Sequence, residues 1–205
     1  MFRDRIEAGQ KLAVALQTKF TTIEKGVVLA LPRGGVVIGY EIAQKLNLPL
    51  DIIVTRKIGA PFNPEYAVAA VSEHELMVSP RENPDPNYLK KEVEDERQEI
   101  QRRLKEYRGQ KPEVDLKNKT AILVDDGLAT GLTMEVAIRE VREKNPRRII
   151  LAVPVAPPET IERLKKLVDE TIVLNIEPMF FAVGQFYEDF PQVSDEDVRK
   201  YLRNF

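Results

Sequence analysis

Residues 120–133 read Thr-Ala-Ile-Leu-Val-Asp-Asp-Gly-Leu-Ala-Thr-Gly-Leu-Thr, and this stretch decides the fold. The run from Ala121 to Val124 is apolar and includes β-branched residues, which is typical of a strand buried on both faces. Asp125 and Asp126 then place two carboxylates at the carboxyl end of that strand, before a loop rich in glycine and threonine. From Met134 to Val141 the apolar residues recur at helical spacing. The predicted order is therefore strand, acidic pair, loop and helix.

This order suits a phosphorylated ribose. A loop that enters a helix offers unpaired backbone N–H groups and the positive end of the helix dipole, and both favour phosphate. Gly127 and Gly131 allow the loop to curl so that its N–H groups converge, and Thr130 and Thr133 add hydroxyl donors. The two carboxylates can accept hydrogen bonds from a vicinal diol or hold Mg²⁺ directly or through water. The alternative is an ordinary strand-to-helix turn with a capping aspartate.

The stretch resembles the phosphoribosyl-diphosphate (PRPP) signature of type I phosphoribosyltransferases, in which a hydrophobic strand is followed by Asp-Asp and a Thr-Gly-x-Thr loop. Gly127-Leu128 departs mildly from the more varied residues often found there. The resemblance implies that the acidic pair binds the ribose hydroxyls and that the loop holds the 5-phosphate. The residues of this stretch that it implies in PRPP binding are Asp125, Asp126, Gly127, Leu128, Ala129, Thr130, Gly131 and Thr133.

Composition restricts the class of protein. The 205 residues are 43% hydrophobic and 31% charged, as in a soluble globular chain of one domain. No 18-residue apolar window predicts a membrane span, and the charged N-terminus does not resemble a signal peptide. The absence of cysteine excludes disulfides, thiolate metal sites and cysteine nucleophiles, and it fits a cytoplasmic protein. A net charge of −2 predicts no general attraction to nucleic acid.

A second unit of strand, loop and helix lies near the N-terminus. The expected strand is 27–31, the loop carries Arg33, Gly34 and Gly35, and the expected helix is 36–46. The arginine has a geometry that matches phosphate, and the paired glycines permit an unusual backbone. A tight turn is the alternative. The family resemblance implies that this loop binds pyrophosphate, and we expect a cis bond between Arg33 and Gly34 or between Gly34 and Gly35.

A third expected strand, 51–55, is followed by Arg56 and Lys57. These cations could neutralise pyrophosphate, or they could form a solvated pair. A similar Arg-Lys pair in adenine phosphoribosyltransferases and their relatives precedes a flexible catalytic loop. The resemblance therefore predicts a mobile lid over residues 59–64, which are rich in glycine and proline.

The remaining segments are less specific. Short strands are expected at 66–71 and 75–78, and His74 between them, the single histidine, reads more simply as a solvated residue than as a base. Residues 86–109 predict a charged helical insertion, which is either solvated or a surface for a partner or a second copy. Type I phosphoribosyltransferases determine acceptor specificity with a variable segment called the hood, and the resemblance implies that the aromatic segment 176–205 is the hood of this chain. Its candidate acceptor-binding residues are Phe180, Phe181, Phe186 and Tyr187, for which a place in the core is the alternative.

Together these elements predict one α/β domain over residues 1–205, with a core at about 25–175 and a mostly parallel, twisted sheet flanked by helices. The resemblance covers that core, and the whole chain is similar to phosphoribosyltransferases whose acceptor is not assigned. It implies transfer of ribose 5-phosphate from PRPP, with Mg²⁺, to a nucleobase or similar nitrogen heterocycle. In that scheme Arg33 and Lys57 assist the leaving pyrophosphate, and Asp125 and Asp126 hold the metal directly or through water. The base that accepts the acceptor's proton would come from the loop after strand 121–124 or from the C-terminal segment, and Asp126 is the first candidate.

The expected partners are PRPP and a small-molecule acceptor, and no binding to membrane or nucleic acid is expected. The sequence leaves open whether the protein forms a homodimer. The alternative function is a regulator that binds PRPP or a nucleotide without transfer.

Overall fold

The computed structural model describes residues 1–20 and 23–205, with the backbone alone described for Glu65. The helices are α1 (Arg5–Lys19), α2 (Gly34–Leu46), α3 (Pro86–Arg108), α4 (Leu132–Glu143), α5 (Pro158–Leu164), α6 (Asp195–Leu202) and the 3₁₀ turn η1 (Val183–Phe186). The strands are β1 (Gly26–Ala30), β2 (Leu50–Ile52), β3 (Arg56–Ala60), β4 (Asn63–Val71), β5 (Leu76–Val78), β6 (Thr120–Val124), β7 (Arg148–Ala156) and β8 (Glu170–Ile176).

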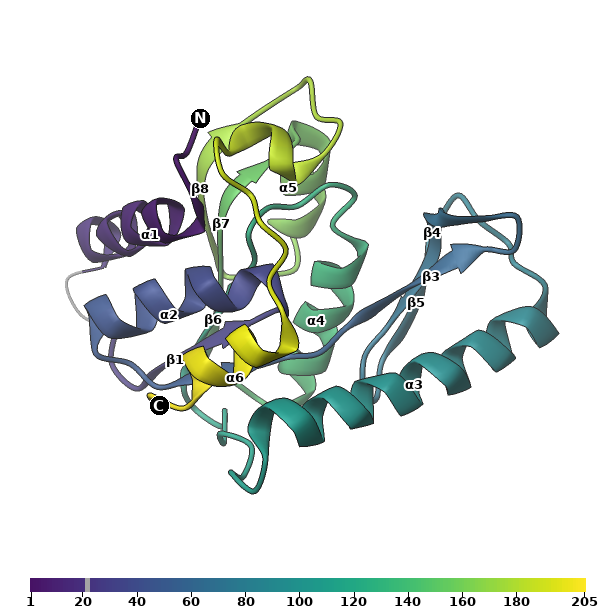
Figure 1. Cartoon of the computed structure of the whole chain (residues 1–205), viewed down its shortest axis with the longest axis horizontal. Helices are drawn as coiled ribbons and strands as arrows, with labels where there is room; N and C mark the ends of the chain where they lie inside the picture. Colours follow the sequence, from purple (N-terminus) through teal and green to yellow (C-terminus); the bar gives the residue numbers. More distant parts are fainter. Residues whose placement is uncertain (21–22) are drawn as a thin grey trace.

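The main sheet is parallel throughout, with the strand order β2-β1-β6-β7-β8 (Figure 1). Strand β6 lies at its centre between β1 and β7, so the segment that follows β6 emerges in the middle of the sheet's carboxyl edge. This architecture confirms the predicted α/β class with a mostly parallel sheet.

Alternate residues of the central strands face two separate cores. Val28 and Ile122 pack in the core shared with α1, α2 and α6, whereas Val27 and Leu123 pack in the core shared with α4 and α5. Both faces of the sheet are therefore covered by helices, which explains why these strands read as continuous apolar runs without polar alternation.

The first helix buries a different face from the one expected at its N-terminal end. The spacing of apolar residues predicts an amphipathic helix over 3–18 with Ile6, Leu12, Ala13 and Leu16 on its apolar face. In the structure Ile6 is 38% exposed, whereas Arg5 is only 8% exposed. Arg5 lies seven residues before the fully buried Leu12 and therefore shares its face of the helix. The prediction for this turn was wrong because the position of the buried stripe is set by what α1 packs against.

Strands β3, β4 and β5 form a separate antiparallel sheet, and α3 lies alongside it (Figure 1). The expected strands at 66–71 and 75–78 are confirmed as β4 and β5. The strand expected at 51–55 is β2, which ends at Ile52, and Arg56 and Lys57 belong to a further strand, β3, rather than to the segment between a strand and a lid. Strand β3 includes Gly59 and Ala60 of the expected lid and pairs with β4 around the turn at Pro61 and Phe62. Pairing between these two segments satisfies backbone groups that a loop would leave to water.

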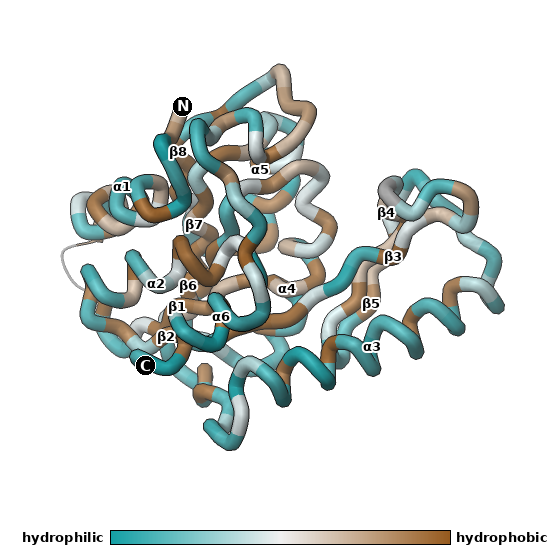
Figure 2. The backbone as a smooth tube through the Cα atoms, viewed as in Figure 1, coloured by the Kyte–Doolittle hydropathy of each residue, from teal (hydrophilic) through white to brown (hydrophobic). Residues whose placement is uncertain are grey.

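The predicted helix at 86–109 is confirmed as α3, and Figure 2 shows that it is largely hydrophilic. It buries Ile100 and Tyr107 and contacts β3, β4 and α6. No helix in the described part of the chain has the length and apolarity needed to cross a membrane.

The apolar run predicts a strand over residues 147–153 that ends before Pro154, but β7 continues through Pro154 to Ala156. The pairing of β7 with β6 stops at Ala152, whereas its alignment with β8 includes Val153 and Val155, on either side of the proline. Pro154 can therefore stay in the strand, because its missing N–H interrupts no ladder bond with β6.

Candidate functional site at the carboxyl edge of the sheet

The β1–α2 loop, residues 31–33, and the β6–α4 loop, residues 125–131, meet beside each other. Ala30 lies opposite Val124 in the β1–β6 ladder, and the Leu31 N–H donates to the Val124 carbonyl at 3.0 Å. A Cβ atom at Gly34 would lie 1.9 Å from Oδ2 of Asp126. The structure therefore brings together the two motifs that the sequence singled out, and their contact leaves no room for a side chain at Gly34.

The position of the cis peptide differs from the prediction. The bond between Pro32 and Arg33 is cis, rather than either of the two following bonds. Gly34 is already the first residue of α2, and the Val36 N–H donates to the Arg33 carbonyl. The two expected bonds lie at the start of a helix, whose backbone requires trans peptides, so that prediction was wrong.

Asp126 is held by a residue from the other end of the chain. The Arg5 Nε atom donates to Asp126 Oδ2 at 2.8 Å, and both side chains are largely buried. Another guanidinium nitrogen of Arg5 donates to the Pro191 carbonyl at 2.7 Å, and its Cζ atom lies 3.6 Å from the centre of the Phe190 ring. Arg5 thus links the acidic pair to the C-terminal segment.

The acidic pair is electrostatically costly in the absence of a ligand. Burial raises the pKa of Asp125 well above its usual range, and the neighbouring charge of Asp126 raises that pKa further. Burial also raises the pKa of Asp126, although the Arg5 guanidinium opposes this shift. The Asp126 N–H donates to Asp125 Oδ1 at 2.8 Å. A site that binds hydroxyl groups or a cation would recover this cost when it is occupied.

We expect Asp125→Asn to stabilise the ligand-free protein at neutral pH, with a rise in Tm of about 2–4 °C, or about 1 kcal/mol for a chain of this size. Because folding raises the pKa of Asp125, the protein is most stable where this carboxyl is protonated in both the folded and the unfolded state. That stability is lost as the pH rises from the unfolded pKa through the folded pKa. The gain should therefore vanish at about pH 4 and below, near the unfolded pKa. Thermal unfolding from pH 4 to 8 in EDTA measures it, and a gain that does not depend on pH would contradict this electrostatic origin.

The β6–α4 loop presents backbone N–H groups at the start of α4. Within the described residues, the amides of Ala129, Thr130 and Gly131 donate no hydrogen bond. Gly131 has φ +69° and caps α4, a conformation that favours glycine. This geometry offers consecutive donors and the positive end of a helix to an anion.

Other residues of the loop attach it to β7 and η1. Leu128 is buried, and its N–H donates to the Val155 carbonyl at 3.0 Å. Gly127 is also buried, where a Cβ atom would lie 2.6 Å from Val183. Thr130 is exposed and Thr133 is half-buried. The exposed part of the loop is therefore Ala129 and Thr130.

Arg56 and Lys57 are separated by the alternation of strand β3. The Arg56 guanidinium donates to Glu96 of α3 at 2.6 Å. Lys57 follows in the strand and is exposed, so its side chain leaves from the opposite face. In this conformation Arg56 is directed to α3 and not to the acidic pair.

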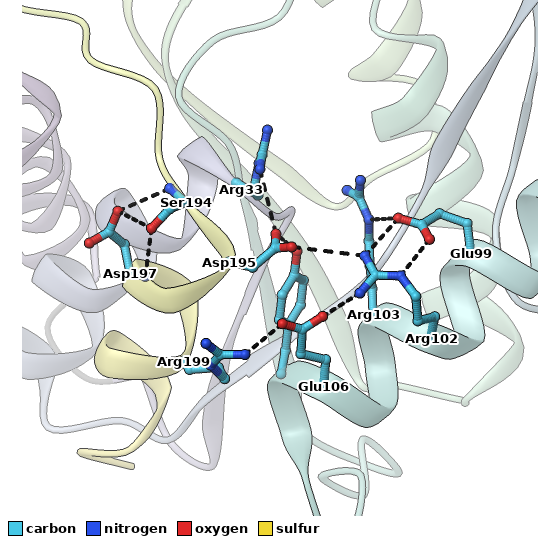
Figure 3. Close-up of polar contacts among 10 residues, drawn as sticks. Arg33, Glu99, Arg102, Arg103, Glu106, Ser194, Asp195, Asp197 and Arg199 are labelled. Carbon is cyan, nitrogen blue, oxygen red and sulfur yellow. Dashed lines mark hydrogen bonds and ion pairs between the residues drawn. The ribbon is translucent and has the colours of Figure 1, made fainter.

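Arg33 is directed towards the C-terminal helix. One of its guanidinium nitrogens lies 3.5 Å from Asp195 Oδ1 at the start of α6, and Figure 3 shows this pair beside the arginines of α3. The Tyr107 hydroxyl donates to the same Asp195 oxygen at 2.5 Å, and Arg102 lies 3.9 Å from the other oxygen. The hydroxyl group and these cations lower the pKa of Asp195, which stays ionised opposite Arg33.

We expect Asp195→Asn to raise the affinity for Mg·pyrophosphate about threefold at low salt. Removal of a carboxylate beside Arg33 frees that cation and lowers the negative potential of the loop. Isothermal titration gives the affinity, and Glu196→Gln, an exposed neighbour in the same turn, is the matched control. A weaker affinity would instead mean that Asp195 positions Arg33 for the anion.

The four hood aromatics occupy different environments. Phe180 and Phe181 line a hollow of about 470 Å³ together with Ala129, Thr130 and the segment 157–159. Phe186 lies behind Phe180, with ring centres 4.9 Å apart. Tyr187 is buried, and its hydroxyl donates to the Asp126 carbonyl at 2.6 Å. Phe180 and Phe181 thus face a space beside the β6–α4 loop, whereas Tyr187 is bonded to the backbone of the acidic pair.

The fold and the site define an α/β protein that gathers an acidic pair and two βα loops at the carboxyl edge of a parallel sheet. The family model described as a phosphoribosyl transferase domain matches residues 4–191. The chain belongs to the phosphoribosyltransferase family.

Similar proteins agree with this assignment. A Mycobacterium tuberculosis protein provisionally named a phosphoribosyl transferase is 38% identical over 98% of this chain, which spans 46% of that protein. The chain therefore covers about half the length of the curated relatives that it matches. A Thermus thermophilus protein of known crystal structure is 45% identical, with a TM-score of 0.83 and coverage of 99% and 98% of the two chains. An Aquifex aeolicus protein shares the fold alone, at 17% identity and a TM-score of 0.51, over 82% and 71% of the two chains.

Three site residues were not anticipated: Arg5, Tyr187 in its contact with Asp126, and Asp195. Arg5 lies 121 residues from Asp126 in the chain. A charged residue in phase with the apolar stripe of α1 was the available signal. No local pattern marks Asp195, because its role depends on where α6 packs.

Proposed function

We propose that the protein transfers the 5-phosphoribosyl group of PRPP to a nitrogen heterocycle. The bond between the anomeric carbon and the pyrophosphate oxygen breaks, a bond from that carbon to an acceptor nitrogen forms, and the acceptor's proton passes to a base. The observation that carries the proposal is the acidic pair between a loop of unpaired N–H groups and an arginine-bearing loop.

Each part of PRPP has a complementary group in this arrangement. The second half of the β6–α4 loop would receive the 5-phosphate, and Asp125 and Asp126 would accept the ribose hydroxyls. Arg33 and Lys57 would neutralise the leaving pyrophosphate. Because Arg5 binds Asp126 Oδ2, a role for Asp126 as base falls to Oδ1.

The donor set fits magnesium. Asp125 and Asp126 offer hard carboxylate oxygens, and Mg²⁺ commonly binds through one or two carboxylates, water and substrate phosphates. When bound, the ion would supply positive charge to the pyrophosphate. Transfer then depends on residues of the chain that hold the two ends of PRPP while the hollow beside Phe180 and Phe181 admits a planar acceptor.

Thermal unfolding of the full chain tests the proposal. At about 100 times Kd, Mg·PRPP should stabilise the protein by about 2.7 kcal/mol. For this size that corresponds to a Tm rise on the order of 5–10 °C. Ribose 5-phosphate should give part of this shift, and omission of Mg²⁺ should reduce the shift with PRPP. The absence of any shift at millimolar PRPP would overturn the proposal.

A panel of nucleobases then tests transfer through pyrophosphate release. Release that depends on one base supports the transferase and names its acceptor class. Binding of Mg·PRPP without release with any acceptor would favour a PRPP-binding regulator.

A further inference from the structure

Helix α5 contacts the β6–α4 loop through two side chains that have no part in the proposed chemistry. The Thr160 hydroxyl donates to the Ala129 carbonyl at 2.7 Å, and the Arg163 guanidinium donates to the Thr130 carbonyl. Thr160 is 1% exposed. Two consecutive carbonyls of the loop are therefore bonded to one helix.

These two bonds determine where the loop's amides point. In a trans peptide the carbonyl of one residue and the N–H of the next point in opposite directions. With the carbonyls of Ala129 and Thr130 bonded to α5, the N–H groups of Thr130 and Gly131 point away from α5. These are among the amides for which the described residues supply no acceptor.

Arg163 is itself held in place. Its Nε atom donates to Glu135 at 3.0 Å, and Glu135, which is 7% exposed, also pairs with Arg139. Glu135 lies in the first turn of α4, and its N–H donates to the Gly131 carbonyl. The charge of Arg163 is therefore balanced by Glu135. Arg163 orients the loop through its hydrogen bond and adds little net positive charge to it.

The loop also packs directly on α5. A Cβ atom at Gly131 would lie 2.6 Å from Thr160 Cγ2 and 3.1 Å from Leu164. Backbone and helix thus touch without an intervening side chain, and the loop cannot turn its carbonyls inward without losing both hydrogen bonds.

We propose that Thr160 and Arg163 are positioning residues that turn the N–H groups of Thr130 and Gly131 towards the 5-phosphate. The inference rests on the proposed function and adds to it a helix outside the signature that prepares the loop before the ligand arrives. A loop prepared in this way binds its anion without first reorganising, which favours affinity.

Titration calorimetry on the full chain tests this with ribose 5-phosphate and, separately, with Mg·pyrophosphate. We expect Thr160→Val, which keeps the shape of the side chain, to weaken ribose 5-phosphate binding about tenfold, because the Ala129 carbonyl loses its donor. Mg·pyrophosphate binding should be unchanged, and Thr160→Ser should restore the affinity. Arg163→Met should have a similar selective effect, and because Arg163 is 42% exposed this variant should fold normally.

Lys165→Met is the matched control. Lys165 follows α5, and its ammonium group pairs with Glu162, so this change removes one positive charge beside the same helix without touching the loop. An equal loss of affinity in this control would mean that charge, and not positioning, accounts for the effect of Arg163→Met.

The possible failures are distinguishable. Wild-type protein that binds neither ribose 5-phosphate nor Mg·PRPP overturns the proposed function and this inference together. Wild-type binding of ribose 5-phosphate, with Thr160→Val and Arg163→Met unaltered or with both ligands weakened alike, overturns the positioning role alone.

Discussion

The double variant Asp125→Asn/Asp126→Asn is expected to lose at least about 100-fold in affinity for Mg·PRPP. Each carboxylate would accept a charge-assisted hydrogen bond from a ribose hydroxyl, and such bonds contribute about 1.5–3 kcal/mol each. Because each 1.4 kcal/mol is about tenfold in affinity, the loss of two such bonds gives at least this factor. Titration with Mg·PRPP measures it directly.

A control variant that loses the same charge elsewhere separates the loss of the acidic pair from a change in the net charge of the protein. Glu188 and Asp189 are adjacent, exposed carboxylates, so Glu188→Gln/Asp189→Asn removes the same formal charge elsewhere. We expect this control to bind Mg·PRPP like the wild type. Near-normal binding by the Asp125 and Asp126 variant would show that the acidic pair is not the ribose site.

The second large effect is expected on stability. Arg5→Ala should lower the free energy of unfolding by about 3 kcal/mol, because removal of one partner leaves the other charge of a buried pair uncompensated. The change also removes the bond to the Pro191 carbonyl and the contact with the Phe190 ring. For this chain length the Tm should fall by about 6–12 °C. Thermal unfolding at pH 7 without ligand is the measurement.

Arg3→Ala is the matched control for this prediction. Arg3 lies two residues away, pairs with Asp4 and is 65% exposed, so its removal should change the Tm little. Arg5→Lys should fall between the two, since it keeps a positive charge but not the guanidinium geometry. An Arg5→Ala variant as stable as the Arg3→Ala control would mean that Asp126 does not depend on Arg5.

The central sheet was predicted from short patterns of consecutive residues. The apolar runs that became β1 and β6 have no polar alternation, because helices cover both faces of the sheet. The acidic pair and the glycine-rich loop follow β6 directly in the chain, so their place at the carboxyl edge is a consequence of chain order. Ser194 before the acidic run 195–197 is likewise a local signal for a helix start, and its hydroxyl accepts from the Asp197 N–H.

Predictions that depended on neighbours in space were less successful. Arg56 and Lys57 were expected between a strand and a lid, but β4 supplies a pairing partner for residues 56–60, and the resulting strand directs Arg56 to Glu96 of α3. The expected extent of β7 ended too early, because Pro154 reads as a breaker unless the chain beside it is known.

The sequence by itself determined the parallel α/β sheet, the acidic pair at its centre and the loops that follow β1 and β6. Each of these is encoded within a few consecutive residues, through periodicity, β-branching and glycine. Only the tertiary structure decided that Arg5 holds Asp126, that Asp195 faces Arg33 and that Thr160 supports the loop. These contacts join residues 31 to 162 positions apart, and which side chains meet is set by how the helices pack on the sheet, information that no local pattern contains.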